Sequence, residues 1–361
     1  MEVLGLKEPN NPLFRIFAGT SVGAINAAFM VANAHRADLG VFELANIYRN
    51  LSIQSHLRIK FRRRRSDPPT DAFSRSLLDA RPLELLVRRS INFDSLHRNL
   101  DNGLTTAVMI AAFNLVNGCT TIFAHTAPGA ILNPSKDPRR VSVPCALSAD
   151  HVLASAAIPL LFPPRRIGDA FFCDGGVRFN TPISPAIRAG ADRLLVISLQ
   201  PEAKQVVEPK LDHYPSTPFV AGKLLNALLL DPFQYDLEVM QRFNQLVDVM
   251  DESLRPEERK RVDSLLTRTR GAPYRKLDTL VFMPSQDLGR IANEHLRAHL
   301  ESWQISSIPR FLMRRAALED ATWEADWAAY LMFDGGYAGR LVDLGLEDAH
   351  RRADDIRAFF T

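Results

Sequence analysis

Two short glycine-containing segments of this sequence carry residues that could do acyl-transfer chemistry. The first, Gly19-Thr20-Ser21-Val22-Gly23, fits G-x-S-x-G, a pattern in which a serine occupies a strained turn between a strand and a helix. We expect a Cβ atom at Gly19 or Gly23 to clash at such a turn, and the amides of the following helix to point toward developing negative charge. Ser21 is therefore a candidate nucleophile.

A serine hydroxyl is a weak nucleophile until a base takes its proton. Phe172-Cys173-Asp174-Gly175-Gly176 places an aspartate after an apolar run and before two glycines, with Asn180 following. We expect the glycines to let the backbone turn sharply and to hold the carboxylate outward. Asp174 is thus the candidate base, and Gly175, Gly176 and Asn180 form its loop.

The tripeptide Asp-Gly-Gly occurs twice, so it does not by itself identify a catalytic aspartate. We interpret the second copy, Asp334-Gly335-Gly336, as a turn that ends a helix.

Histidines offer an alternative base. His125, His151, His213 and His295 could each be the third member of a Ser-His-Asp triad, and chain order does not dismiss His213 or His295. Neither of these two is flanked by a glycine-rich loop, so we interpret both as surface or packing residues. A histidine-dependent esterase remains an alternative.

The elements that position these residues follow an alternating pattern. Residues 13–17 form a short apolar strand candidate, and the serine turn leads from it into the small-residue helix candidate 24–34. Further strand-like runs lie at residues 105–111, 120–124, 194–199 and 279–283. Because helical patterns separate these runs, the sequence predicts an α/β fold.

The pattern divides the chain into three parts. Residues 1–200 carry both motifs and form the expected catalytic domain, while residues 201–276 are polar and helical, as in an insertion or lid. Residues 277–361 hold a final core strand and a helical extension.

Composition excludes several classes of protein. The chain has 361 residues, 46% of them hydrophobic and 24% charged, and its net charge of +3 does not indicate nucleic-acid binding. Cys119, Cys145 and Cys173 are far apart, so neither a disulfide framework nor a metal site is expected, and nothing calls for a cofactor. Without an apolar run of about 18 residues or a signal-like start, we expect a cytoplasmic or peripheral membrane protein.

Four segments in order resemble the patatin-like phospholipases. They are FRIFAGTSVGAINA at residues 14–27, LASAAIPLLFPP at 153–164, the Asp174-Gly175-Gly176 box, and residues 190–199. The resemblance covers about residues 4–200 and implies a three-layer α/β/α sandwich. It also implies a lipid or phospholipid ester as substrate and a Ser-Asp dyad, in which Ser21 attacks the acyl carbonyl, Asp174 accepts its proton, and water releases the acyl-enzyme.

One family feature has no counterpart in the printed sequence. Members carry, ahead of the nucleophile, a strand and a loop of the form G-G-G-x-R-G whose amides make the oxyanion hole, whereas residues 1–6 resemble the end of the helix that follows that loop. The explanations are a start placed too far downstream or an inactive scaffold that binds lipid or a partner. We expect the printed chain to be less active and less stable than an extended one, with the Val22 N–H as a remaining oxyanion donor.

A basic cluster lies at Arg62, Arg63, Arg64 and Arg65, next to Arg58 and Lys60. This cluster could be a solvated loop or a surface that is attracted to anionic lipid headgroups.

Overall fold

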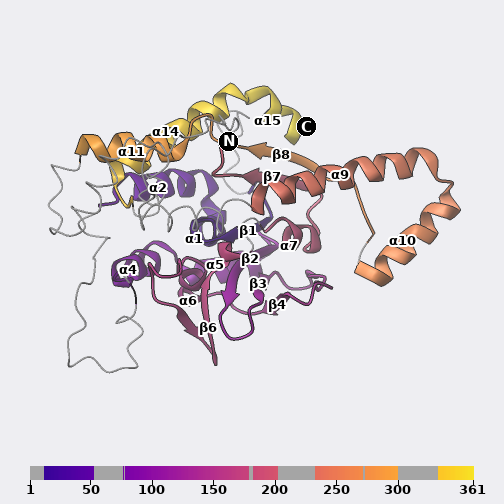
Figure 1. The fold of residues 1–361 in the computed structure, drawn as a ribbon, viewed down its shortest axis with the longest axis horizontal. Helices are drawn as coiled ribbons and strands as arrows, with labels where there is room; N and C mark the ends of the chain where they lie inside the picture. Colours follow the sequence, from indigo (N-terminus) through magenta and orange to yellow (C-terminus); the bar gives the residue numbers. More distant parts are fainter. Residues whose placement is uncertain are drawn as a thin grey trace, which may run out of the picture.

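The computed structural model describes residues 12–52, 76, 78–178, 182–201, 232–270, 273–299 and 332–361 (Figure 1). A mixed sheet carries the site. Its strands are β1 (Ile16–Thr20), β2 (Ala107–Asn114), β3 (Thr120–Thr126), β4 (Arg140–Pro144), β5 (Arg165–Ile167) and β6 (Ala170–Asp174). Their order is β4-β3-β2-β6-β5, with β1 also paired to β2.

The central strand β2 has two partners along one edge. Ala107 to Ala111 pair with β1 in parallel, and Ala112 to Asn114 pair with β6 in antiparallel register. On its other edge β2 pairs with β3 in antiparallel register. Strands β1 and β6 therefore run toward each other and end at adjacent positions of β2.

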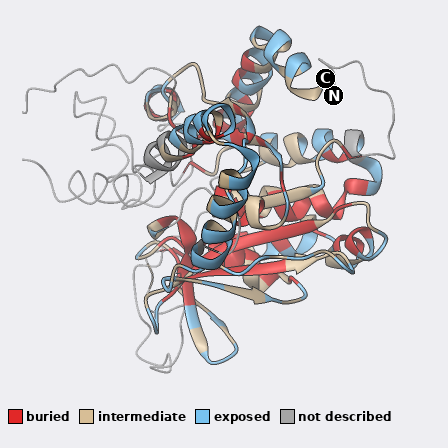
Figure 2. Cartoon of the chain, turned by 90° about the vertical axis from the view of Figure 1, so that its right-hand side faces the viewer, coloured by how far each residue is buried: buried red, intermediate tan, exposed pale blue. Residues whose placement is uncertain are grey.

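Helices and short turns cover both faces of this sheet. They are α1 (Val22–Ala32), the 3-10 turn η2 (Ala34–Arg36), α2 (Ala37–Arg49), α4 (Arg81–Ser90), α5 (Phe93–Asp101), α6 (Ala149–Ser155), the 3-10 turn η4 (Gly175–Val177) and α7 (Ile183–Arg188). Side chains alternate along β2, as expected for a buried strand. Val108, Ile110 and Ala112 pack in one core with α1, α5 and α6, whereas Met109 and Ala111 pack in a second core with α7. The chain is thus the predicted α/β/α sandwich (Figure 2).

The second half of the chain adds a two-stranded parallel sheet and more helices. They are β7 (Arg193–Ile197), α9 (Pro232–Ser253), α10 (Pro256–Arg270), β8 (Asp278–Phe282), α11 (Leu288–His299), α14 (Gly335–Arg351) and α15 (Ala353–Phe360). β7 pairs with β8, so α9 and α10 lie within the connection between paired strands, and α10 projects from the body (Figure 1). The division into three domains stays a prediction.

Helix α14 is linked to the first half of the chain by a hydrogen bond and an ion pair. Its first residue, Gly335, donates its N–H to Leu51 O at 2.8 Å, and Arg49 Nη2 lies 2.5 Å from Asp343 Oδ1. A Cβ at Gly335 would lie 2.0 Å from Arg49 O, so only glycine permits this close approach.

The structure corrects two local predictions. The strand expected at residues 13–17 lies at Ile16–Thr20, because the chain stays extended through Gly19 as far as the serine turn. The expected helix-ending turn at Asp334 is wrong: Asp334 is the residue that precedes and caps α14, and its carboxylate accepts the N–H groups of Gly336 and Tyr337 at 3.0 and 3.2 Å. These donors have no acceptor inside the helix, which explains an aspartate at this position.

Within the described part of the chain, no helix combines the length and apolar character that crossing a bilayer requires.

Candidate active site

The site lies where β1 and β6 meet on the edge of β2. Thr20, the last residue of β1, is opposite Ala111, and Asp174, the last residue of β6, is opposite Ala112. Ser21 follows Thr20 directly. The pairing of both strands with β2 therefore brings Ser21 and Asp174 together although 153 positions separate them in the sequence.

Ser21 has a strained backbone. Its φ of 55° and ψ of −125° lie outside the regions that L-residues ordinarily occupy. Such conformations cost about 1–3 kcal/mol and cluster at functional sites. Helix α1 begins immediately afterwards at Val22, and its first N–H groups, those of Val22 and Gly23, have no acceptor within the helix.

The two glycines of the motif are not equivalent. A Cβ at Gly19 would lie 2.1 Å from Gly23 O and 2.7 Å from Ala24 N, so Gly19 allows α1 to pack closely against β1. A Cβ at Gly23 would meet no atom within 4 Å. The expectation of a clash therefore holds at Gly19 and is wrong at Gly23.

The carboxyl group of Asp174 is buried, and not held outward as expected. Asp174 is 0% exposed, and its Oδ1 accepts the Gly176 N–H at 2.8 Å. Its Oδ2 makes no hydrogen bond of regular geometry to the described residues, although the Ser21 side chain interacts with the carboxyl group. Burial raises the pKa of Asp174 to about 6, and the smaller opposing effects come from Ser21 and the Gly176 N–H.

Gly175 lets the aspartate turn approach β1 and β2. A Cβ at Gly175 would lie 2.4 Å from Ala111 O and 3.1 Å from Thr20 Cγ2. Any side chain here would push Asp174 away from the serine turn.

Sequence reasoning missed Ser155 as a site residue. Its Oγ accepts the Ser21 N–H at 2.9 Å and donates to Ala111 O at 2.6 Å, and the residue is 0% exposed. Ser155 is the last residue of α6 and belongs to neither motif. A signal was available, because a serine among the apolar residues ahead of Pro159 needs a buried hydrogen-bond partner.

Some predicted residues lie outside the described parts of the chain. They are Asn180, the four arginines Arg62, Arg63, Arg64 and Arg65, and His213.

The described histidines make their hydrogen bonds elsewhere. His295 Nε2 lies 2.6 Å from Asp334 Oδ1, and His151 Nδ1 lies 2.8 Å from Ser148 Oγ. The buried Nδ1 of His125 has no hydrogen-bond partner within the described part of the chain. Among the described residues, no histidine hydrogen-bonds Ser21 or Asp174.

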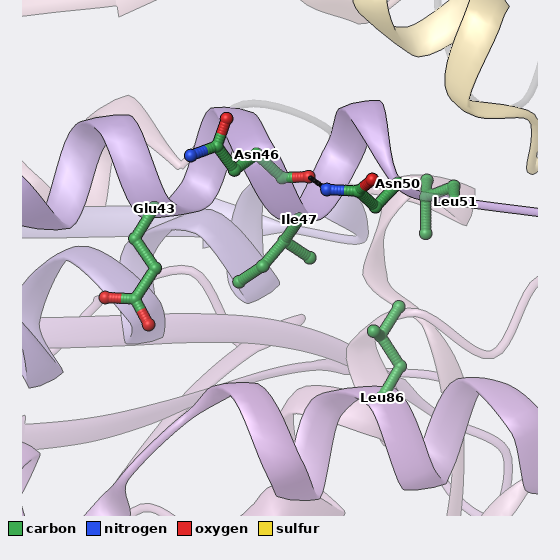
Figure 3. Close-up of a pocket in the computed structure, with 6 residues that line it drawn as sticks. All are labelled: Glu43, Asn46, Ile47, Asn50, Leu51 and Leu86. Atoms are coloured by element: carbon green, nitrogen blue, oxygen red, sulfur yellow. Dashed lines mark hydrogen bonds between the residues drawn. The ribbon is translucent and has the colours of Figure 1, made fainter.

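A separate pocket of about 290 Å³ lies between α2 and α4 (Figure 3). Glu43, Asn46, Ile47, Asn50, Leu51 and Leu86 line it. None of these residues belongs to the serine or aspartate turn. In the regions that the structure describes, no group of three His, Cys, Asp or Glu side chains is placed to hold a metal ion.

No curated protein matches the chain. The family model of the patatin-like phospholipases matches residues 2–187, more than half of the chain, and the match spans Ser21, Ser155 and Asp174. The chain therefore belongs to the patatin-like phospholipase family.

Proposed function

We propose that this protein is a serine-dependent lipid acyl hydrolase that uses Ser21 and Asp174 as a catalytic dyad. Membership of the family indicates lipid acyl hydrolase activity. The observation that carries the dyad is a strained serine at a strand-to-helix turn, beside a buried carboxyl group whose pKa is raised to about 6 and with which the Ser21 side chain interacts.

The first half of the reaction is acylation. Asp174 takes the proton of the Ser21 hydroxyl while Ser21 Oγ attacks the ester carbonyl, and the same proton then passes to the leaving alcohol. A base works best when its pKa lies near the working pH, and a carboxyl group of pKa about 6 remains largely ionised at neutral pH.

The second half releases the acyl group. Asp174 takes a proton from a water molecule that attacks the acyl-enzyme, and the oxygen of Ser21 leaves and recovers its proton. No histidine is required for either half.

The negative charge of the tetrahedral intermediate needs donors. The Ser21 N–H is bound to Ser155 Oγ, so we assign a donor role to the next amide, Val22 N–H, at the beginning of α1. The dipole of α1 favours negative charge at the same place.

Membership of the family indicates a lipid ester as the substrate. We still predict that this protein contacts an anionic membrane through Arg62, Arg63, Arg64 and Arg65.

Substitution of the dyad tests the proposal. Ser21→Ala should abolish hydrolysis of p-nitrophenyl esters, and Asp174→Asn should slow it by about 100- to 10,000-fold, the usual contribution of a general base. His213→Ala and His295→Ala serve as controls that retain turnover, with circular dichroism to verify folding. Loss of turnover in a folded histidine variant would favour the triad mechanism instead.

A further inference from the structure

Exposed apolar side chains gather on a projection beside the site. It consists of the β5–β6 hairpin and the turn at residues 115–118, which we call the docking tip. Phe171, Leu115 and Val116 are 44%, 46% and 70% exposed. Leu115 donates its N–H to Phe171 O at 2.8 Å, which joins the hairpin and the turn into one surface.

Strand register places the docking tip beyond the site. Asp174 is opposite Ala112 and Phe172 is opposite Asn114, so Phe171 and Leu115 lie three residues past the Asp174–Ala112 pair. At about 3.3 Å per residue, this is roughly 10 Å further along the strands. The hairpin projects from the lower end of the molecule in both views, with mostly exposed or half-exposed residues (Figures 1 and 2).

The docking tip also carries positive charge. Arg178 Nη1 donates to Gly118 O at 2.5 Å, and Arg166 Nε donates to Gly168 O at 3.0 Å. Asp169, 3.4 Å from Arg166, is the opposing carboxylate within the hairpin. Arg165, a third arginine of the hairpin, is paired with Glu84 at 2.8 Å. Arg166 and Arg178 against Asp169 therefore leave a net positive charge beside the apolar side chains.

We propose that the docking tip rests on an anionic lipid bilayer, with Phe171, Leu115 and Val116 in the headgroup region. Surfaces that combine exposed apolar side chains with arginines bind the headgroup region of anionic bilayers. Contact here would turn the edge that carries Ser21 and Asp174 toward the lipid. The functional meaning of this orientation rests on the proposed lipid hydrolase function. Binding of the docking tip to the bilayer does not depend on that function.

Val116→Asp is the test variant, because Val116 lies on an exposed turn and contacts neither Ser21 nor Asp174. Val249→Asp is the matched control, since Val249 is 57% exposed on α9, away from the docking tip. The full chain is mixed with vesicles of phosphatidylcholine, with and without phosphatidylglycerol, and the bound fraction is measured by flotation. Hydrolysis is measured on vesicle phospholipid and on a soluble p-nitrophenyl ester.

We expect the wild type and Val249→Asp to bind the anionic vesicles. Val116→Asp should bind at least about tenfold more weakly, because a charge replaces an apolar side chain that the bilayer would otherwise cover. Vesicle hydrolysis should fall in parallel while soluble-ester turnover is retained. Val116→Trp adds a second readout, a blue shift of its fluorescence on anionic vesicles.

Equal vesicle binding by the wild type, Val249→Asp and Val116→Asp would overturn the proposal. A Val116→Asp variant that changes only the oligomeric state would also overturn it, because the docking tip would then contact a second copy of the chain. Absence of soluble-ester turnover in the wild type would instead contradict the proposed function, and vesicle binding would still decide the role of the docking tip.

Discussion

The Ser155 hydroxyl holds the backbone of Ser21 in place. It accepts the Ser21 N–H at 2.9 Å and donates to Ala111 O at 2.6 Å, so it links the serine turn to the central strand. The strained φ of Ser21 persists only if its surroundings hold it, and this pair of hydrogen bonds does so from the base of the site.

Ser155→Ala is expected to lower kcat by about 100-fold with little change in KM, because a displacement of about 1 Å in a reacting group can cost that much. The Ser21 N–H would also lose its buried partner, at a cost of about 1–3 kcal/mol in the free energy of unfolding. Steady-state kinetics and amide hydrogen exchange measure the two effects. Exchange should quicken at Ser21 and stay slow at Asp174, whose N–H is bound to Ala157 O at 2.9 Å.

Val152→Ala separates positioning from stability. Val152 is 0% exposed on the same helix as Ser155, and its truncation should cost about 2 kcal/mol of stability without moving Ser21. Ser155→Thr, which keeps the hydroxyl, should recover part of kcat. If Ser155→Ala and Val152→Ala have the same kcat as the wild type, Ser155 has only a structural role.

The glycines of the serine motif should respond differently to alanine. Gly19→Ala forces a Cβ to within 2.1 Å of Gly23 O, so it should destabilise the fold and remove activity. Gly23→Ala meets open space in the first turn of a helix, where alanine is favourable by up to about 1 kcal/mol. Thermal unfolding and esterase rates of the two variants test this contrast, and equal damage at both positions would refute it.

The pH dependence of hydrolysis should report the ionisation of Asp174. The base must be ionised, so kcat/KM should rise with pH and level off above a pKa of about 6. A profile measured from pH 3 to 8 with a soluble ester gives this value. A rise centred near pH 4 would mean that the carboxyl group is solvated in the working enzyme.

Burial of Asp174 should cost stability at neutral pH. Its pKa is raised from 3.8 to about 6, so the folded protein binds the proton more tightly than the unfolded chain does. The free energy of unfolding therefore falls as pH rises from about 4 to 6, by about 3 kcal/mol in total. Asp174→Asn lacks this titration, and its stability relative to the wild type should increase across the same window in urea unfolding. A constant difference between pH 4 and 7 would contradict the assignment.

Local patterns made part of this structure predictable from the sequence. Small residues after Ser21 predicted the helix that packs against the sheet, because alanine allows close approach, and α1 is that helix. Glycines beside Asp174 predicted a tight turn, and Gly175 indeed lies where a Cβ would touch Ala111 O.

Non-local pairing explains what could not be predicted. The meeting of β1 and β6 on β2 depends on register between distant strands, which residue periodicity does not encode. Burial of Asp174 and the bond from Ser21 to Ser155 both follow from that meeting. Asp334 shows the same limit, since an Asp-Gly-Gly turn can end one helix or begin another, and here it begins α14.

Trapping the acyl-enzyme tests the central claim most directly. The protein is mixed with a p-nitrophenyl ester and quenched with acid, and the modified residue is located by peptide mass spectrometry, with Ser21→Ala as the control. We predict a burst of p-nitrophenol and an acyl group on Ser21 that is absent from Ser21→Ala. An acyl group on another residue, or hydrolysis that persists in Ser21→Ala, would contradict the account.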